Sequence, residues 1–164
     1  MHAHRNLLID LVNKRSNSSD PLSIIISLEN ANLKKVNLKG ADLRGAKLMR
    51  AKLQEADLEE TDLNGANLQG AQLTRVHLER ADLTQVNLEG ANLQEANLHG
   101  ANLHGANLHG ANLQGANLDS SHLIQTHLET AILMRANLRR AILREAYLED
   151  SHLIDAKLQG ADLQ

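Results

Sequence analysis

Residues 96–110 read ANLHGANLHGANLHG, three copies of one five-residue unit. The same spacing continues on both sides, because Leu occupies every fifth position from Leu33 to Leu163. The residue two places before each of these leucines is Ala or, in seven units, Val, Thr or Ser. A pattern kept over 27 consecutive units predicts a repetitive scaffold rather than an irregular globular domain.

A period of five fits neither a straight helix nor a flat strand. On an α-helix five residues advance by about 500°, so successive leucines would spiral around all sides instead of forming one apolar stripe. On a strand, side chains alternate between two faces, so leucines five apart would point in opposite directions. The pattern therefore predicts a chain that turns a corner once per unit and keeps every Leu, with the small residue two places before it, in one shared interior.

The residues around each Leu are typical of tight turns. All ten glycines stand two places after a central Leu, where Gly tolerates positive φ at no steric cost. Because other units place Lys, Arg, Glu, Gln, Asp, Ser or Thr there, we expect that positive φ is not required at every corner. The residue before the Leu is Asn or Asp in most units, and we expect these side chains to bond nearby backbone groups and to stack in ladders.

Units such as ANLQG, ADLRG and ANLHG make residues 31–164 resemble the pentapeptide repeat family, whose consensus is A(D/N)LXX. The resemblance implies an all-β fold, a right-handed quadrilateral parallel β-helix with four units in each coil. With 27 units this gives about seven coils, and we expect a short N-terminal α-helical cap before them. The recurrence of Asp42, Asp62 and Asp82 at intervals of 20 residues agrees with such a coil.

The N-terminal residues predict a short helix near 4–14, because four apolar residues share one face at helical spacing: Leu7, Leu8, Leu11 and Val12. We interpret this helix as a cap over the open end of the coil, with partner docking as the alternative. The chain then divides into a capping segment, residues 1–25, and a β-helix, residues 26–164. The other end lacks a cap, which predicts exposed leucines, unpaired strand edges and a homodimer through the C-terminal coil.

The composition predicts a core of Leu and Ala, since the chain has no Phe, no Trp and one Tyr. Representative core positions are Leu33, Leu58, Leu83, Leu108, Leu133 and Leu158. The absence of Cys excludes disulfides and thiol chemistry. The sequence shows neither a secretory leader pattern nor an apolar run long enough to cross a membrane. We predict a cytoplasmic protein.

Charge is unevenly distributed along the chain. Residues 31–52 contain seven basic residues and one acid, whereas residues 53–130 contain eleven acids and two basic residues. This predicts a basic collar before an acidic middle, either as ordinary solvated surface or as the footprint of a partner. Nucleic acid is not favoured as that partner, because no aromatic residue stands among the basic ones.

The nine histidines do not predict a metal site. Three of them follow successive leucines, so a four-sided coil directs them to different faces: His99, His104 and His109. Along one face, a column such as Glu79, His99 and Asp119 does not demand the tetrahedral closure of a zinc site. Serines beside histidines, such as Ser121 beside His122, occupy inward positions. We therefore predict no metal, no cofactor and no catalytic residue.

Outward positions become apolar only late in the chain. Six residues there replace the usual polar ones and form our candidate interface: Ile124, Ile132, Met134, Ile142, Tyr147 and Ile154. A 20-residue coil places Ile132, Met134 and Ile154 on one face, and Ile124 with Ile142 on the opposite one. Such clusters are typical of interaction surfaces. The alternative is lateral packing of β-branched residues between coils.

Two functions are compatible with this organisation. The first is a noncatalytic structural or protein-protein interaction scaffold with an unidentified partner, as the resemblance to small pentapeptide repeat proteins of cyanobacteria implies. The second, also implied by the family, is a DNA mimic that binds a type II topoisomerase and protects it from quinolones. We favour the scaffold, because every central residue is Leu where such mimics often have Phe, and because the basic collar interrupts the acidic surface.

Overall fold

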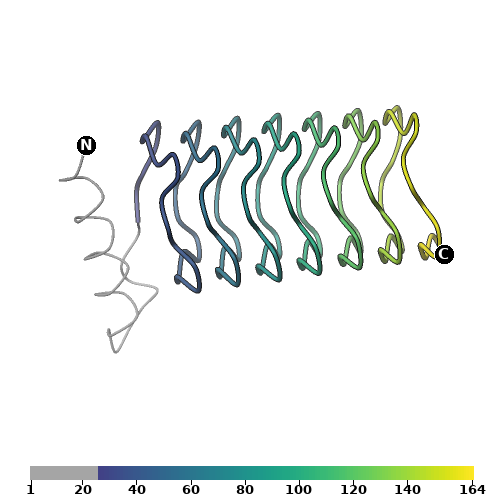
Figure 1. The fold of residues 1–164 in the computed structure, drawn as a ribbon, viewed down its shortest axis with the longest axis horizontal. Helices are drawn as coiled ribbons and strands as arrows, with labels where there is room; N and C mark the ends of the chain where they lie inside the picture. Colours follow the sequence, from purple (N-terminus) through teal and green to yellow (C-terminus); the bar gives the residue numbers. More distant parts are fainter. Residues whose placement is uncertain (1–25) are drawn as a thin grey trace.

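The computed structural model describes residues 26–164, which form one continuous coil (Figure 1). Each bridged residue pairs in parallel with the residue 20 positions later, from Ser27 with Lys47 to Ile142 with Asp162. The bridges are isolated pairs separated by turns, so residues 26–164 contain neither a helix nor an extended strand. The described chain is a parallel β-helix with the 20-residue coil that the sequence predicts.

Four columns of bridges define four faces of the coil. Face 1 begins at Ser27, face 2 at Asn32, face 3 at Asn37 and face 4 at Asp42, and each column holds seven bridged residues at intervals of 20. We assign to each face the bridged residues, the outward residue after each Leu and the corner residue that follows it. Faces 1 and 3 are opposite one another, as are faces 2 and 4.

In units with Asn or Asp before the Leu, the backbone donors are satisfied in a repeating way, as residues 91–95 illustrate. The N–H of Asn92 donates to the preceding coil at 2.9 Å, and the N–H groups of Leu93 and of the corner residue donate to the following coil at 2.7 and 3.0 Å. The N–H of Ala91 closes the turn on the carbonyl of the preceding Leu at 2.9 Å. The remaining N–H, that of Gln94, donates to the side-chain oxygen of Asn92 at 3.1 Å. Polar backbone groups are thus paired without a regular strand.

The preference for Asn or Asp before the Leu follows from the last of these bonds. From Asn32 to Asp162, all sixteen Asn or Asp residues in this position accept a hydrogen bond from the N–H two residues later. The N–H of the residue after the Leu makes no bond to a neighbouring coil within residues 26–164. The short side chain of Asn or Asp is close enough to accept a hydrogen bond from it. The expectation that these side chains bond nearby backbone is confirmed.

The expectation about the corners was wrong. All 27 corner residues from Asn30 to Gly160 have positive φ, between 54° and 72°, although seventeen of them are not Gly. The small residue of the next unit closes each turn on the Leu carbonyl, and positive φ at the residue before it is what a type II turn requires. The closing bond and the coil-to-coil bonds fix the backbone, so Arg, Glu, Lys and Thr accept a conformation that they seldom adopt.

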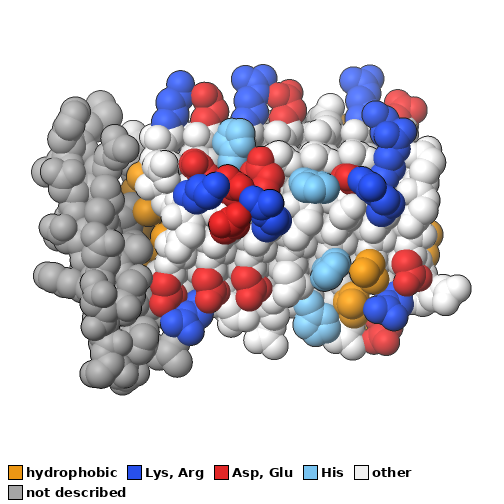
Figure 2. All heavy atoms as spheres, turned by 60° about the horizontal axis from the view of Figure 1, so that its bottom comes forward, with side chains coloured by type: hydrophobic (Ala, Val, Ile, Leu, Met, Phe, Trp, Pro, Cys, Tyr) orange, Lys and Arg blue, Asp and Glu red, His pale blue; other side chains and the backbone are white. Residues whose placement is uncertain are grey.

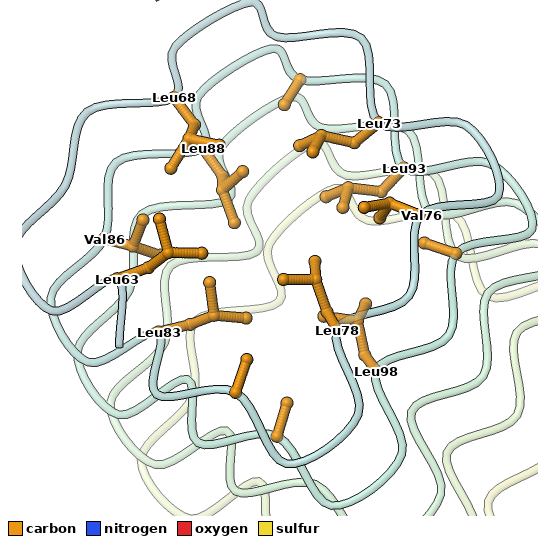
Figure 3. Close-up of a cluster of buried hydrophobic side chains, with 14 of the residues drawn as sticks. Leu63, Leu68, Leu73, Val76, Leu78, Leu83, Val86, Leu88, Leu93 and Leu98 are labelled. Atoms are coloured by element: carbon orange, nitrogen blue, oxygen red, sulfur yellow. The ribbon is translucent and has the colours of Figure 1, made fainter. Parts of the chain in front are cut away.

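Leucine side chains fill the interior and the small residues line it (Figure 3). Five of the representative core leucines are buried: Leu33, Leu58, Leu83, Leu108 and Leu133. Burying one such side chain contributes about 1.5–3 kcal/mol. The buried hydroxyls of Thr61 and Thr126 donate to backbone carbonyls of the preceding coil at 3.0 and 2.8 Å, which makes these residues acceptable in place of Ala.

Burial falls in the last coil. Leu158 is only partly buried there, and Leu163 is 57% exposed. In earlier coils the N–H of each central Leu donates to the following coil, but the N–H groups of Leu148, Leu153 and Leu158 have no backbone acceptor within residues 26–164. The predicted exposure of leucines and strand edges is therefore confirmed. The predicted helix near residues 4–14 and its capping residues Leu7, Leu8, Leu11 and Val12 lie outside the described residues.

Candidate functional site

The six residues of the candidate interface are distributed over three faces. Three of them lie together on face 2: Ile132 is bridged to Asn112 and His152, while Met134 and Ile154 follow leucines one coil apart. We call Ile132, Met134 and Ile154 the late apolar face. Ile154 is 67% exposed, whereas Ile132 and Met134 are half-buried. In the earlier coils of the same column the residues corresponding to Met134 and Ile154 are polar, as at Gln94 and Gln114.

A second pair, Ile124 and Ile142, lies on face 4. Figure 2 shows apolar side chains on this side, near histidines and charged groups. Both residues are half-buried, and Ile142 is bridged to His122 and Asp162. The structure therefore places this pair opposite the late apolar face, as the sequence predicts.

Tyr147 lies on face 1, apart from the other five candidates. Its ring stacks on that of His127 one coil earlier, with centroids 4.6 Å apart and planes inclined by 10°. Nδ1 of His127 lies 3.0 Å from Oε1 of Glu129. Burial raises the pKa of Glu129, but the hydrogen bonds from His127 and from the backbone outweigh burial and lower this pKa overall. Tyr147 is 44% exposed and belongs to this stacked pair rather than to an apolar patch.

Face 3 carries a network of charged residues (Figure 2). Glu59 accepts hydrogen bonds from Lys39 and Arg80, each at 2.6 Å, and Arg80 also reaches Glu60 at 2.7 Å. The ammonium of Lys39 and the guanidinium of Arg80 hold the pKa of Glu59 below its ordinary value. The partners stand 20 or 21 residues apart, so the network links successive coils.

The corner of face 2 forms a row of alternating charge, visible along the upper edge of Figure 2. Its members are Lys35, Glu55, Arg75, Glu95, Gly115, Arg135 and Asp155. Neighbouring coils pair within this row at distances of 3.2, 2.7 and 3.9 Å. Exposed pairs of this kind each contribute little to stability, about 0–1 kcal/mol. The row neutralises its own charges and offers no unpaired group to a partner.

The histidines are arranged as predicted. His99, His104 and His109 occupy faces 3, 4 and 1, so their rings diverge. Nδ1 of His99 lies 3.4 Å from the carboxylate of Asp119, while Glu79 instead binds the amide of Asn97. Within residues 26–164 no group of three or more His, Asp or Glu residues could hold a metal ion.

The buried hydroxyls are used for structure. Ser121 is buried and its Oγ donates to the carbonyl of Leu118 at 2.8 Å, while its neighbour His122 is exposed on the outside of the wall. A hydroxyl held inside the core has no access to substrate, so this Ser and His do not form a nucleophile with its base. The described surface offers binding groups in columns rather than a converging set of reactive ones.

Sequence reasoning missed which charged groups find partners. Pairing depends on the residue 20 or 21 places away, as for Arg80 with Glu60 and for Arg140 with Asp119. Three members of the predicted basic collar are paired in this way or within their own unit: Lys35, Lys39 and Arg44. The sequence signal that could have identified these pairs is a spacing of about 20 residues between opposite charges.

A parallel β-helix built from five-residue units, with its variable side chains displayed in columns, defines the class of solenoid repeat proteins. The model of the family described as pentapeptide repeats matches the chain in eight copies, over residues 26–50, 50–80, 81–119, 111–149 and 131–164. The chain belongs to the pentapeptide repeat family. Its coil is the right-handed β-helix of this family's solved structures.

Several solved structures are similar to the chain. A pentapeptide repeat protein from the thylakoid lumen of Arabidopsis thaliana is 30% identical over 55% of this chain, with a TM-score of 0.47, and the match spans 59% of that protein. Trypsin-treated QnrB1, a plasmid-mediated fluoroquinolone resistance protein, is 16% identical with a TM-score of 0.59, over 85% of this chain and 90% of its own.

A cyanobacterial relative is also similar. Rfr23, a pentapeptide repeat protein from a Cyanothece cyanobacterium, is 26% identical with a TM-score of 0.48, over 85% of this chain and 88% of its own. No curated protein sequence matches the chain significantly. Within the described residues, no helix is long and apolar enough to span a membrane.

Proposed function

We propose that this protein is a noncatalytic scaffold for protein-protein interaction, and that the late apolar face is its docking surface. The observation that carries the proposal is the exposure of Ile154, 67%, beside Met134 and Ile132 on one face. Ile154 stands in the last described coil, where no further coil within residues 26–164 covers it, so its apolar side chain is open to a partner. An exposed aliphatic group next to two others is typical of an interaction site.

The position of this face supports the same proposal. It lies on a rigid wall whose backbone bonds to the coils before and after Ile132 at 2.9 and 2.8 Å. A partner would therefore meet a preformed surface and would not need to order a loop, which lowers the cost of binding. The predicted cytoplasmic location belongs to this proposal and is checked by cell fractionation.

The test compares two variants in an affinity capture from the source cells. Ile132→Asn, Met134→Gln and Ile154→Gln together return the late apolar face to the polar residues of earlier coils. The matched control makes the same kinds of change on face 4, Ile124→Gln with Ile142→Asn. We expect a protein partner that the wild type and the control retain and that the face 2 variant loses.

Two other outcomes would overturn this assignment. Loss of the partner from the control alone would move the docking surface to face 4. Identical captures from all three baits, with a lower unfolding midpoint for the face 2 variant, would show that the apolar residues serve packing between coils. Circular dichroism of each bait confirms that the solenoid is folded before the capture.

A homodimer through the last coil is a second part of the proposal. It is supported by the exposed Leu163 and by the N–H groups of Leu148, Leu153 and Leu158, which have no backbone acceptor within residues 26–164. A second copy would cover this apolar end and pair these donors. We expect sedimentation to give twice the chain mass for the wild type and the chain mass for Leu163→Glu. A monomeric wild type at high concentration contradicts the dimer.

A topoisomerase-binding DNA mimic is the alternative function. It is favoured by the column of acids on face 4, Asp42, Asp62 and Asp82, which are bridged in register. The likeness to QnrB1, at 16% identity, is a likeness of fold. A gyrase supercoiling assay decides, because a mimic inhibits or protects the enzyme and a scaffold leaves supercoiling unchanged at micromolar concentration.

A further inference from the structure

Four basic residues near the beginning of the coil have no acidic partner among the residues that the structure describes. Lys34, Lys47, Arg50 and Lys52, which we call the basic edge, are exposed and form no ion pair with any residue in the range 26–164. Most other Lys and Arg side chains of the same range lie within 3.9 Å of a carboxylate. Outside the basic edge only Arg139 and Lys157 also lack such a partner within residues 26–164, so the basic edge is the largest group of uncompensated cations there.

The four cations gather around one corner of the solenoid. Lys47 is a bridged residue of face 1, Arg50 is the corner residue that follows, and Lys52 is the first bridged residue beyond the corner, on face 2. Lys34 stands on face 2 of the preceding coil, two residues after Asn32, to which Lys52 is bridged. The side chains thus project from adjacent positions on two faces and the corner between them.

The surroundings of the basic edge are almost neutral. The following coil presents only uncharged residues there: Asn67, Gln69, Gly70, Gln72 and Thr74. Gly70 adds no side chain there, and the stem of Arg50 lies beside it, with Cγ 3.5 Å from the place that a Cβ would take. One acid, Glu29, stands on face 1 of the preceding coil, and Glu55 at the next corner is already paired with Lys35.

The opposite side of the same coils is different. On faces 3 and 4, Lys39 is bound by Glu59, and Arg44 by Asp42 and Asp62, at 2.6, 2.7 and 3.4 Å. The collar predicted from the sequence is therefore not a ring of positive charge. Its uncompensated part is confined to the corner between faces 1 and 2, which concentrates the positive potential on one side of the solenoid.

We propose that the basic edge binds an acidic, Asp- or Glu-rich segment of a partner protein. Three ammonium groups and one guanidinium would pair with its carboxylates, Arg50 being able to bind one in a bidentate way. The amides of Gln69 and Gln72 on the neighbouring coil are further donors for carboxylate or peptide oxygens. This surface is separate from the late apolar face and does not depend on the function proposed for it.

A protein partner fits the site better than a nucleic acid. Single-stranded nucleic acids are held by aromatic rings on which bases stack, and the one Tyr of the chain, Tyr147, is five coils from Lys47 on face 1. Glu29 beside the cations would repel a continuous phosphate backbone, whereas the carboxylates of a peptide can be spaced to avoid it. The basic edge also lacks the regular rows of Arg that bind duplex phosphates.

The experiment measures binding of a fluorescein-labelled poly-glutamate peptide by fluorescence anisotropy, at low and at physiological salt. The test variant is Lys47→Gln with Arg50→Gln. The control, Arg139→Gln with Lys157→Gln, removes one Arg and one Lys from exposed positions on face 3, so both variants have the same net charge. Neither pair forms an ion pair within residues 26–164, and Arg139 only donates to Gln159, so both variants should fold as the wild type does.

We expect the wild type and the control to bind the peptide, and the test variant to bind about tenfold more weakly, with affinity falling as salt rises. Equal weakening in both variants would attribute binding to net charge and overturn the proposal, as would no binding by the wild type at low salt. Tighter binding of an oligonucleotide of the same charge would overturn the choice of a protein partner. Poly-glutamate binding that survives in the Ile132→Asn, Met134→Gln, Ile154→Gln variant separates this site from the late apolar face.

Discussion

The side-chain amide of Asn137 donates to Oδ1 of Asn117 at 2.9 Å, across one coil of face 3. Asn117 in turn donates to Oδ1 of Asn97, also at 2.9 Å. The three residues form a ladder that runs along the axis of the solenoid, as expected for stacked asparagines. The same Asn117 oxygen accepts the N–H of Asp119 at 3.3 Å, so one side chain serves both the turn and the stack.

This ladder predicts the effect of Asn117→Ala. The change removes a bond to each neighbouring coil as well as the turn bond, and we expect a loss of about 2 kcal/mol in the free energy of unfolding. Asn112→Ala is the matched control, because Asn112 makes the turn bond to Gln114 at 3.0 Å and no ladder bond within residues 26–164. Urea unfolding should show the control to be clearly less affected, and equal losses would mean that the ladder adds nothing.

The corners predict an unusual stabilising change. Thr130 has a φ of 57°, a costly conformation for a β-branched residue, and its Oγ1 lies 3.6 Å from the place of a Cβ on Gly110. We expect Thr130→Gly to raise stability by about 1 kcal/mol, because relief of strain exceeds the added entropy of the unfolded chain. Gly110→Ala should lower it by a similar amount, about 1 kcal/mol. Thermal unfolding measures both, and a destabilised Thr130→Gly protein would contradict the strain.

The core predicts a contrast between two leucines. Leu83 is 1% exposed and Leu163 is 57% exposed. Leu83→Ala should cost about 3 kcal/mol, since it leaves a cavity between coils, whereas Leu163→Ala should cost less than about 1 kcal/mol. Guanidinium titration of both variants measures the difference. A small effect of Leu83→Ala would mean that the coils collapse around the gap.

Acid should weaken the solenoid partly through Asp119. The hydrogen bond from Arg140 holds the pKa of Asp119 below its ordinary value of 3.8, so this carboxylate stabilises the folded chain above that pH. The contribution disappears as the pH falls through the lowered pKa of the folded state. The stability difference between wild type and Asp119→Asn should therefore be largest near neutral pH and shrink below about pH 4. A difference that is constant from neutral to acid pH would show that the pair does not titrate in this range.

The period of five determined most of the fold because the core repeats it. Each Leu and the small residue before it must point inward, and recurring residues such as Asp42, Asp62 and Asp82 already indicate the 20-residue coil. The conformation of the corners was not predictable from residue type. Lys35 and Glu60 adopt positive φ because hydrogen bonds on both sides fix the turn, and local preference yields to them.

The candidate site was predictable as a set of columns but not as a surface. The register alone places Met134 and Ile154 together, whereas the exposure of Ile154 depends on which coil covers it. The basic edge could not be separated from the collar by counting charges. Lys39 and Lys47 look alike in sequence, and only the carboxylate of Glu59, 20 residues after Lys39, distinguishes them.

The central claim is that the 20-residue register brings distant residues onto one face, and cross-linking tests it most directly. The chain has no Cys, so Met134→Cys with Ile154→Cys introduces one possible disulfide on the late apolar face. Ile124→Cys with Ile154→Cys, on opposite faces, is the control. Under mild oxidation we predict an intramolecular disulfide in the first variant and none in the second, because a disulfide requires Cα atoms about 4.4–6.8 Å apart. A disulfide in the control, or its absence in the first variant, would contradict the register and the surfaces built on it.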